Sequence, residues 1–518
     1  MIVSFSSWLP FGNFLIKSTQ SRQLSTTAVL LIGVPACWLV CRALLRHNEK
    51  RKKLPPGPAS HFLLGSVPYL QKLRKDMDTS NRDALMLELS KRFGLIFTVW
   101  VPLTGRIVIA VDPKFAKHVL VTKNYPKAPS YQRLAPLFGS RSMLTLPSKE
   151  WASKRRAFNP GFGPSFLKNV VAVMTDKLER FVEAIDEDIA LDQNTNMVTR
   201  AKNFTSDVIV AVAFGEDWGG KEPHPARILE EQLNQLLHNY ISRPIGMVFD
   251  FNTKWMIQKC EEKLDDEMMK IVERRLSQKE DASSVTKDIC TTAIDQIKHE
   301  NKSSHLTAED KISVAHQLKT FYFAGHETTA VLISWAIWSL SQHPTVLSTV
   351  RAELNELGIW GDGHATKKHP TYDDLLNCTY LGAILKECLR LYPPAGSGRF
   401  VVDEGEMYNG YAIGGCTIGV NVFCMHRHPS LWNEPESFRP ERFLDGSEAN
   451  LSEKFIPFMR GPRDCIGKHF AMLEAKLAVS RLVLKYDFDC VDPKEEIVRH
   501  LTAAPKNGAQ VKFRLIGQ

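Results

Sequence analysis

Residues 455–476 read FIPFMRGPRDCIGKHFAMLEAK, and the chain is organised around the cysteine in this stretch. Cys465 stands between an apolar run that ends at Gly461 and Pro462 and a helical pattern that starts near Ile466. The positive end of a helix dipole and the free N–H groups of the first turn stabilise an anion. The sequence therefore predicts that Cys465 is a thiolate that binds a metal.

The neighbours of Cys465 support a metal cofactor rather than an ordinary buried cysteine, which is the commoner role of this residue type. Gly461 and Gly467 have no Cβ, so the backbone at these positions can lie against a flat cofactor. Arg463 adds a cation two residues before Cys465, which suits an acidic group on the cofactor.

The spacing of Phe458, Gly461, Arg463, Cys465 and Gly467 resembles the heme-ligand loop of the cytochrome P450 superfamily, F-x-x-G-x-R-x-C-x-G. The resemblance implies the P450 fold, a large and mainly helical α+β domain with small β-sheets. It also implies a heme b cofactor whose iron takes its axial thiolate from Cys465. The expected activity is that of a monooxygenase, an oxidoreductase that receives electrons from NADPH through a reductase.

The N-terminus of this 518-residue chain is basic and apolar. Residues 1–54 hold eight Lys or Arg and one Glu, whereas the whole chain has a net charge of +9. Residues 24–45, LSTTAVLLIGVPACWLVCRALL, are long enough to span a bilayer, and the cations that follow orient the rest of the chain toward the cytosol. This charge pattern favours membrane lipid as a partner and argues against nucleic acid.

We expect four parts: a short segment at 1–23, a transmembrane anchor at 24–45, a basic and Pro-rich hinge at 46–59 and the catalytic domain at 60–518. The anchor and hinge are similar to those of family members in the endoplasmic-reticulum membrane. Residues 1–48 contain no acidic residue and are rich in Ser, so a mitochondrial transit peptide is the alternative. The ten cysteines form no disulfide framework, which fits a reducing compartment.

Within the catalytic domain, β-branched and aromatic residues at 95–111 predict a hairpin that turns near 102–105, and residues 410–422 predict a second β-like patch. Between them the pattern is mostly helical, with polar breaks expected at 215–225 and 278–305.

Residues 312–340 predict a central helix because they are apolar on nearly every side. Inside it, AGHETT at 324–329 resembles the family signature A-G-x-[DE]-T-[TS], which implies that Thr328 steadies the oxygen ligand and Glu327 relays protons. Fatty-acid ω-hydroxylases of the superfamily often have Glu directly before the G-H-[DE]-T run, where this chain has Ala324. Alanine at this position leaves open space above the iron and disfavours an ω-hydroxylase.

Two further arginines are candidate contacts for the cofactor. Trp151 and Arg155 share a helix face, and W-x-x-x-R resembles the segment that reaches a heme propionate in the family. Arg399 is a further candidate propionate contact. Solvent-facing cations near these positions indicate a docking surface for the reductase: Lys154, Arg156, Arg460, Lys468 and Lys476. Cytochrome b5 is a second candidate electron donor.

Glu387 and Arg390 lie three residues apart in a helix, and Arg442 lies in Pro-Glu-Arg-Phe. The set resembles the family's E-x-x-R and P-E-R-F arrangement, which implies that it holds the Cys465 loop and takes no part in the chemistry.

Substrate choice is expected to depend on residues 125–145, 321–332, 395–398 and 502–508, which correspond to the pocket-lining regions of the family. The ligand loop is most similar to fungal members of secondary metabolism, which implies a lipophilic polyketide or terpenoid. Oxidation of a fatty acid or sterol is an alternative. Two other classes stay open: a heme-thiolate isomerase or dehydratase that acts without O2, and a membrane-bound gas sensor.

Overall fold

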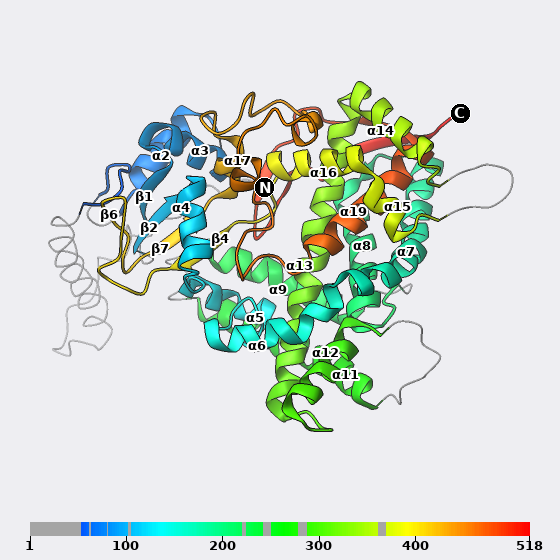
Figure 1. Cartoon of the computed structure of the whole chain (residues 1–518), viewed down its shortest axis with the longest axis horizontal. Coiled ribbons are helices and arrows are strands. Elements are labelled where there is room, and N and C mark those ends of the chain that lie inside the picture. The colour runs from blue at the N-terminus through cyan, green and yellow to red at the C-terminus, as the bar shows by residue number, and fades with distance from the viewer. Residues whose placement is uncertain are drawn as a thin grey trace, which may run out of the picture. The chain divides into compact units, whose positions relative to one another are not determined.

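Most of the described chain is helical (Figure 1). The structure is a computed structural model that describes residues 53–517, apart from 62–63, 80, 102–104, 220–223, 242–249, 278–286 and 361–368. The segment predicted at 1–23, the anchor predicted at 24–45 and part of the predicted hinge lie outside the described residues. Among the helices that are described, none combines the length and apolar character needed to cross a bilayer.

The longer helices carry most of the core. They are α2 (Val67–Asp76), α3 (Arg82–Phe93), α6 (Ser148–Phe158), α7 (Pro164–Ala190), α8 (Met197–Ile209), α9 (Pro225–Ile241), α11 (Phe251–Ser277), α12 (Ile289–Asn301), α13 (Ala308–Ser341), α14 (Pro344–Glu356), α16 (Thr379–Leu391) and α19 (Lys468–Lys485). Shorter helical segments connect them: α4 (Pro113–Lys117), η2 (His118–Thr122), η3 (Pro129–Leu134), α5 (Ala135–Phe138), η4 (Asn159–Phe162), η5 (Val210–Phe214), α15 (Tyr372–Asn377), α17 (Val422–Arg427), η6 (Pro440–Phe443) and α18 (Leu451–Lys454).

The largest described sheet has the strand order β1-β2-β7-β4 and lies beside α2 and α3 (Figure 1). Strands β1 (Ile96–Val101) and β2 (Gly105–Ala110) form the predicted hairpin, and β2 pairs in parallel with β7 (Thr417–Val420), which pairs antiparallel with β4 (Ser397–Phe400). Smaller sheets join β3 (Thr195–Asn196), β11 (Gln510–Leu515) and β8 (Tyr486–Cys490), then β9 (Ile497–Arg499) with β10 (Ala503–Pro505), and β5 (Met407–Tyr408) with β6 (Tyr411–Ala412). The predicted mainly helical α+β class with small sheets is confirmed.

Helix α13 runs through the middle of the helical part, as predicted (Figure 1). It begins at Ala308, earlier than expected, because Thr307 and Asp310 form a reciprocal capping box. Nearly all of its residues from Ser313 to Leu340 are buried against α8, α11, α16 and α19. The helix is therefore a rigid support for any group placed along it.

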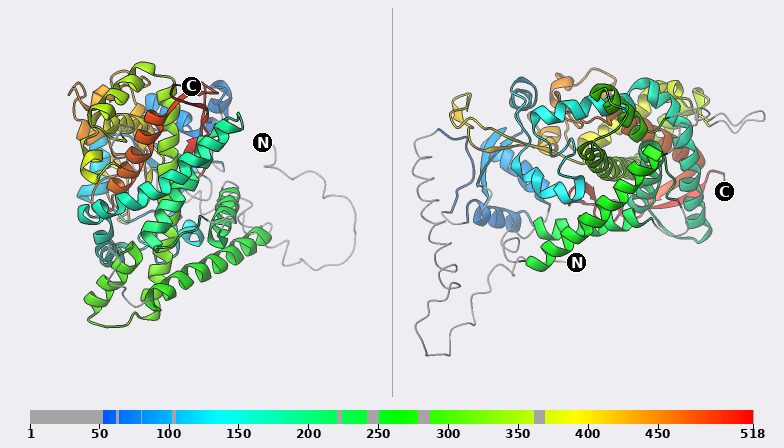
Figure 2. Two further views of the ribbon diagram at one scale, coloured as in Figure 1. Left: turned by 90° about the vertical axis from the view of Figure 1, so that its right-hand side faces the viewer. Right: turned by 90° about the horizontal axis from the view of Figure 1, so that it is seen from below.

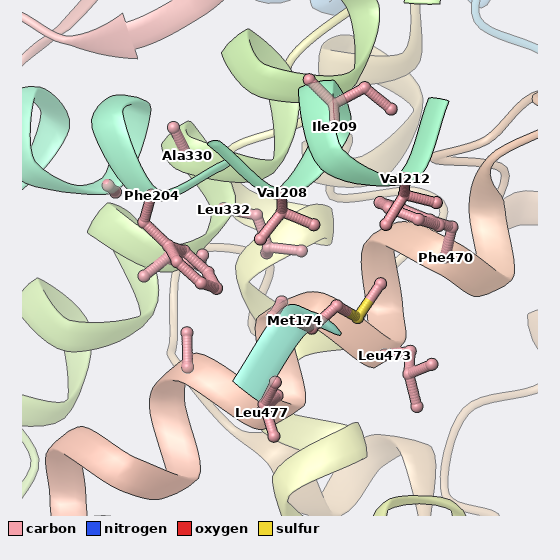
Figure 3. Packing of buried hydrophobic residues seen from close by; sticks show 14 of the residues in the cluster. Met174, Phe204, Val208, Ile209, Val212, Ala330, Leu332, Phe470, Leu473 and Leu477 are labelled. Carbon is pink, nitrogen blue, oxygen red and sulfur yellow. The ribbon is translucent and has the colours of Figure 1, made fainter. Parts of the chain in front are cut away.

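Apolar side chains from helices far apart in sequence close the core around α13. Figure 3 shows Met174 of α7, Val208 of α8, Leu332 of α13 and Leu473 of α19 within one cluster. Helices α9 and α11 pack against each other at one edge of the helical part (Figure 2).

The polar break predicted at 278–305 is wrong over much of its length, because α12 occupies Ile289–Asn301. Asp288 caps this helix, and its side chain accepts a hydrogen bond from Thr291 N at 2.8 Å. The buried residues Ile289, Ala293 and Ile297 recur every four positions, so packing stabilises a helix that looks polar overall.

Candidate functional site

The loop that carries Cys465 is shaped by its own backbone. Cys465 N donates to Phe458 O at 2.9 Å, and α19 begins three residues after Cys465. Gly461 has a φ of +81°, and a Cβ there would lie 2.3 Å from Leu120 O. The loop thus needs glycine at position 461 for its turn and for its close approach to η2, a reason that the sequence pattern did not reveal.

The Cys465 side chain is exposed, although protein atoms surround it closely enough that burial raises the pKa of its thiol. The backbone N–H of Gly467 acts in the opposite direction and favours the thiolate. On α13, Ala324 is also exposed while residues 321–323 and 326–327 are buried. Helix α19, which follows the Cys465 loop, packs against α13, the helix that carries Ala324.

Two buried arginines beside the loop have no counter-ion among the described residues. Arg399 of β4 is fully buried, and among the described residues none accepts a hydrogen bond from its three guanidinium nitrogens. Arg463 donates through Nη1 to Leu146 O at 3.2 Å, whereas its Nε and Nη2 find no acceptor in the described part of the chain. Burial, followed by the charge of Arg399, lowers the pKa of Arg463 to about 10. No described acidic side chain contacts these free nitrogens, so the two buried cations suit an anion that binds beside the loop.

Trp151 and Arg155 of α6 both reach the Cys465 loop, but in different ways. The Trp151 ring lies under the guanidinium of Arg463, 4.7 Å from ring centroid to Cζ. Arg155 donates to Asp464 O at 2.8 Å and to Asp464 Oδ1 at 3.0 Å, and it also bonds Asn159. Arg155 thus ties α6 to the residue before Cys465, and its contact with a propionate stays a prediction.

Lys127 and Tyr131 also lie at this place; the range 125–145, predicted to line the pocket, includes them, but neither residue was singled out. Lys127 Nζ lies 3.2 Å from Ser397 Oγ and 3.5 Å from the Tyr131 hydroxyl. Burial lowers the pKa of Lys127, and the nearby charges of Arg399 and Arg463 act in the same direction. The signal was weak because Lys127 is one of many lysines, and its contacts with β4, the hydrogen bond to Ser397 and the bridge to Arg399, form only in the folded chain.

The polar residues of α13 have hydrogen-bond or ion-pair partners, some of them on other elements. Thr328 Oγ1 donates to Ala324 O at 2.8 Å, the bond that bends a helix at such a position. Glu327 is buried and forms an ion pair with Lys202 of α8, with Oε2 and Nζ 2.6 Å apart. Its Oε1 accepts from Thr502 Oγ1 at 2.9 Å. Burial acts to raise the pKa of Glu327, but Lys202, His326 and Thr502 outweigh it and lower the net pKa.

The structure brings Glu387, Arg390 and Arg442 together in a fully buried network. Arg390 forms two bonds of 2.8 Å to the Glu387 carboxylate, and Arg442 Nε lies 3.0 Å from Glu387 Oε1. Arg390 also donates to His426 O, and His426 Nε2 accepts from Ile456 N at 3.0 Å, at the start of the Cys465 loop. The network therefore reaches the loop through His426.

The family model described as cytochrome P450 matches residues 55–513. The chain belongs to the cytochrome P450 family. Among similar proteins, human cytochrome P450 4Z1 is 26% identical over 95% of this chain and 98% of its own length. Mouse cytochrome P450 4X1 is 28% identical over 98% and 99%, and dog cytochrome P450 3A12 is 28% identical over 90% and 91%. These relatives are mammalian and lend no support to the predicted resemblance to fungal members.

This P450 is a monooxygenase with a heme-thiolate iron cofactor and reductase-supplied electrons, and it acts on a lipophilic substrate. The residues present fit the heme. Arg399 and Arg463 would hold its propionate groups, Cys465 would give its sulfur to the iron, and the exposed Ala324 would leave room on α13.

Proposed function

We propose that this P450 hydroxylates or epoxidises an apolar small molecule, with Cys465 as the axial ligand of the iron. The observation that supports this most directly is the pair of buried guanidinium groups, Arg399 and Arg463, which lack acceptors in the described chain beside the Cys465 loop. The propionates would satisfy both, and Trp151 would keep Arg463 in position by its stacking contact.

When bound, the heme iron activates O2 with electrons from the reductase. The chain's own residues supply the rest of the chemistry. Thr328 offers a hydroxyl anchored to Ala324 O, and Glu327 is the acidic group through which protons reach that hydroxyl. Apolar residues of α13 on either side, among them Phe323 and Leu332, exclude bulk water from this part of the helix.

The substrate is proposed to be a polyketide or terpenoid, and a fatty acid or sterol is the alternative. Ala324 supports the first choice because it offers no carboxylate for a covalent bond to the heme. The similarity to mammalian cytochromes P450 4Z1 and 3A12 is the reason to test fatty acids and sterols as well.

The proposed electron donor is an NADPH-cytochrome P450 reductase, which would dock on cations near Cys465. Arg156 is exposed and Lys468 is partly exposed, so both suit an acidic partner. Lys476 suits it less, because its Nζ donates inward to Leu375 O at 2.7 Å.

We also propose that residues 24–45 anchor the enzyme in the endoplasmic-reticulum membrane. Fractionation of cells that express the chain with and without residues 1–53 tests this.

The function is tested on the purified enzyme with a reductase, NADPH and a metabolite extract. We expect a red-shifted Soret band in the reduced, carbon-monoxide-treated protein, and mass spectrometry should detect products that gain one oxygen. Cys465→Ser should lose both signals, whereas Cys490→Ser, at the end of β8, should keep them. Turnover that persists without NADPH would instead favour an isomerase or dehydratase, and heme binding without any substrate-induced spectral change would favour a gas sensor.

A further inference from the structure

A turn at residues 500–502 joins β9 to β10 and contacts two helices at once. Arg499 and Ala503 are the last pair of the hairpin ladder, so residues 500–502 form its tip. The base of the hairpin is anchored, because Arg499 Nε lies 2.7 Å from Asp83 Oδ2 of α3 and Ala503 N donates to Pro394 O at 2.9 Å. The tip is therefore carried on a fixed support.

Thr502, on one side of the tip, reaches the acid of α13. Thr502 is 4% exposed, and its Oγ1 donates to Oε1 of Glu327 at 2.9 Å. Lys202 of α8 pairs with the other carboxylate oxygen, Oε2, at 2.6 Å. Both oxygens of Glu327 are thus held from outside α13, which fixes the orientation of the carboxylate more firmly than one bond would.

His500, on the other side of the tip, reaches α9. Its Nδ1 lies 3.0 Å from Nε2 of His238 in the last turn of α9, and the two rings meet edge to face with centroids 4.2 Å apart. One of the two ring nitrogens donates and the other accepts. His500 N also donates to Thr502 O at 3.0 Å, so a displacement of His500 would carry Thr502 with it.

We propose that the turn at 500–502 positions Glu327 for proton delivery: Thr502 fixes the carboxylate, and the contact between His500 and His238 fixes the turn against α9. The inference rests on the proposed role of Glu327. It makes Thr502 a positioning residue that acts through the acid. It also gives α9, which packs against α5 in the predicted pocket-lining range 125–145, an influence on where the acid lies.

Burial and charge decide which of the two contacts matters more. Burial acts to raise the pKa of Glu327, but the charge of Lys202 and the hydroxyl of Thr502 act to lower it, so the carboxylate is ionised at neutral pH. Loss of the Thr502 hydroxyl would leave one oxygen of a buried charge without its donor, which is the costly case. The contact between the two histidines lies at the surface, where water can replace it, so its loss should have the smaller effect.

Infrared spectroscopy of the ferric holoenzyme at pH 7 provides the first test. The carboxylate band of Glu327 is identified in the difference spectrum against Glu327→Gln. The band should shift in Thr502→Val, which removes the hydroxyl and keeps the shape of the side chain, and return in Thr502→Ser. Thr175→Val is the control and should leave the band in place, because the buried Thr175 hydroxyl donates to Val171 O within α7.

Turnover provides the second readout. Thr502→Val should lower the product formed per NADPH by about tenfold and raise peroxide, because a misplaced acid delivers protons less often. Thr502→Ser should restore the yield, and Thr175→Val should not change it.

Hydrogen exchange tests the link to α9. His238→Phe should speed the exchange of amides in residues 497–505 by about threefold or more, because the turn loses a hydrogen bond to α9. It should also shift the Glu327 band by less than Thr502→Val does. His299→Phe, at an exposed position of α12, should change neither.

An unshifted band in Thr502→Val, or unchanged exchange in His238→Phe, would overturn the proposal. A chain that binds heme but inserts no oxygen would contradict the proposed function instead. The infrared and exchange measurements need no turnover, so they would still decide whether the turn holds Glu327 in place.

Discussion

At the scale of single residues, Arg399 and Arg463 are the most informative features of the site. Burying a guanidinium group costs free energy unless an acceptor satisfies it, and the described residues supply none for Arg399, which favours an anion bound at this place. Each charge-assisted hydrogen bond to such an anion contributes about 1.5–3 kcal/mol. The cofactor and the chain therefore stabilise each other.

Arg399→Met should release heme faster than the unchanged enzyme, by about tenfold or more, because a charge-assisted bond to a propionate is lost. Transfer of heme to an excess of apomyoglobin measures this rate. Arg351→Met is the control, because Arg351 donates to Val483 O and Tyr486 O, and it should leave heme loss unchanged. An equal rate of heme loss in both variants would show that Arg399 does not contact the heme.

Thr328→Ala should keep NADPH consumption while product falls and peroxide rises, because the anchored hydroxyl that passes protons is gone. Parallel assays of NADPH, product and peroxide measure the ratio. Ser334→Ala removes the same kind of backbone bond in α13, from Ser334 Oγ to Ala330 O at 2.7 Å, and should keep full coupling. An unchanged yield per NADPH in Thr328→Ala would show that this residue does not deliver protons.

The sequence identified the residues of this site that stand in short motifs, and it missed those that tertiary contacts bring in. Cys465, Thr328 and Glu387 each lie in a spaced pattern that can be read along the chain. Lys127 and Lys202 do not, because their partners lie on β4 and α13, and a lysine on a helix or loop is usually a solvated surface charge.

At the scale of elements, helices were predictable where apolar residues dominate and were missed where polar residues conceal a narrow buried face. Helix α13 belongs to the first kind and α12 to the second.

Helix α19 contains a buried acid, Glu474, whose two carboxyl oxygens have no hydrogen-bond partner in the described chain. Burial raises the pKa of Glu474 well above its ordinary value, against a smaller opposing effect of Thr329.

Glu474→Gln should therefore make the protein more stable at neutral pH. The native state holds the proton that the unfolded chain releases, so stability is lost as the pH rises above the ordinary value for Glu, at a slope of up to about 1.4 kcal/mol per pH unit. Thermal unfolding followed from pH 5 to 8 measures the slope, which should be smaller in the variant.

Glu353→Gln is the contrasting change. Its carboxylate accepts bonds from Tyr380 N and Leu381 N, so the variant should be less stable than the unchanged protein at neutral pH. A pH slope in Glu474→Gln equal to that of the unchanged protein would mean that Glu474 is ionised in the fold.

At the scale of the whole molecule, one ionic network joins segments that are far apart in sequence. Glu387, Arg390 and Arg442 connect α16 with η6, and Glu448 extends the network to Lys454 in α18 at 2.6 Å. Motif resemblance indicated the first three residues. Glu448 and Lys454 stand in no motif, and only the folded chain brings them into the network.

Glu387→Gln should lower the free energy of unfolding by about 3–5 kcal/mol, because two buried guanidinium groups lose their shared carboxylate. Thermal unfolding and the heme content of the purified protein measure the effect. In Glu441→Gln, a partly exposed acid of η6 loses only its bond with the Tyr380 hydroxyl, and the change should stay below about 1.5 kcal/mol. A similar loss of unfolding free energy in both variants would contradict the prediction that Glu387 contributes more to stability than Glu441.

Gly325 limits how this enzyme can adapt to new substrates. A Cβ at that position would lie 2.8 Å from Ile209 Cγ1, and one turn away Thr205 Oγ1 donates to His326 O at 2.8 Å, so α8 and α13 are held at a fixed separation. A variant that gained space by shifting α13 would also pull Glu327 away from Lys202. Substitutions of side chains and loops can therefore reshape the binding region at little cost in stability, whereas substitutions that change the spacing of α8 and α13 cannot.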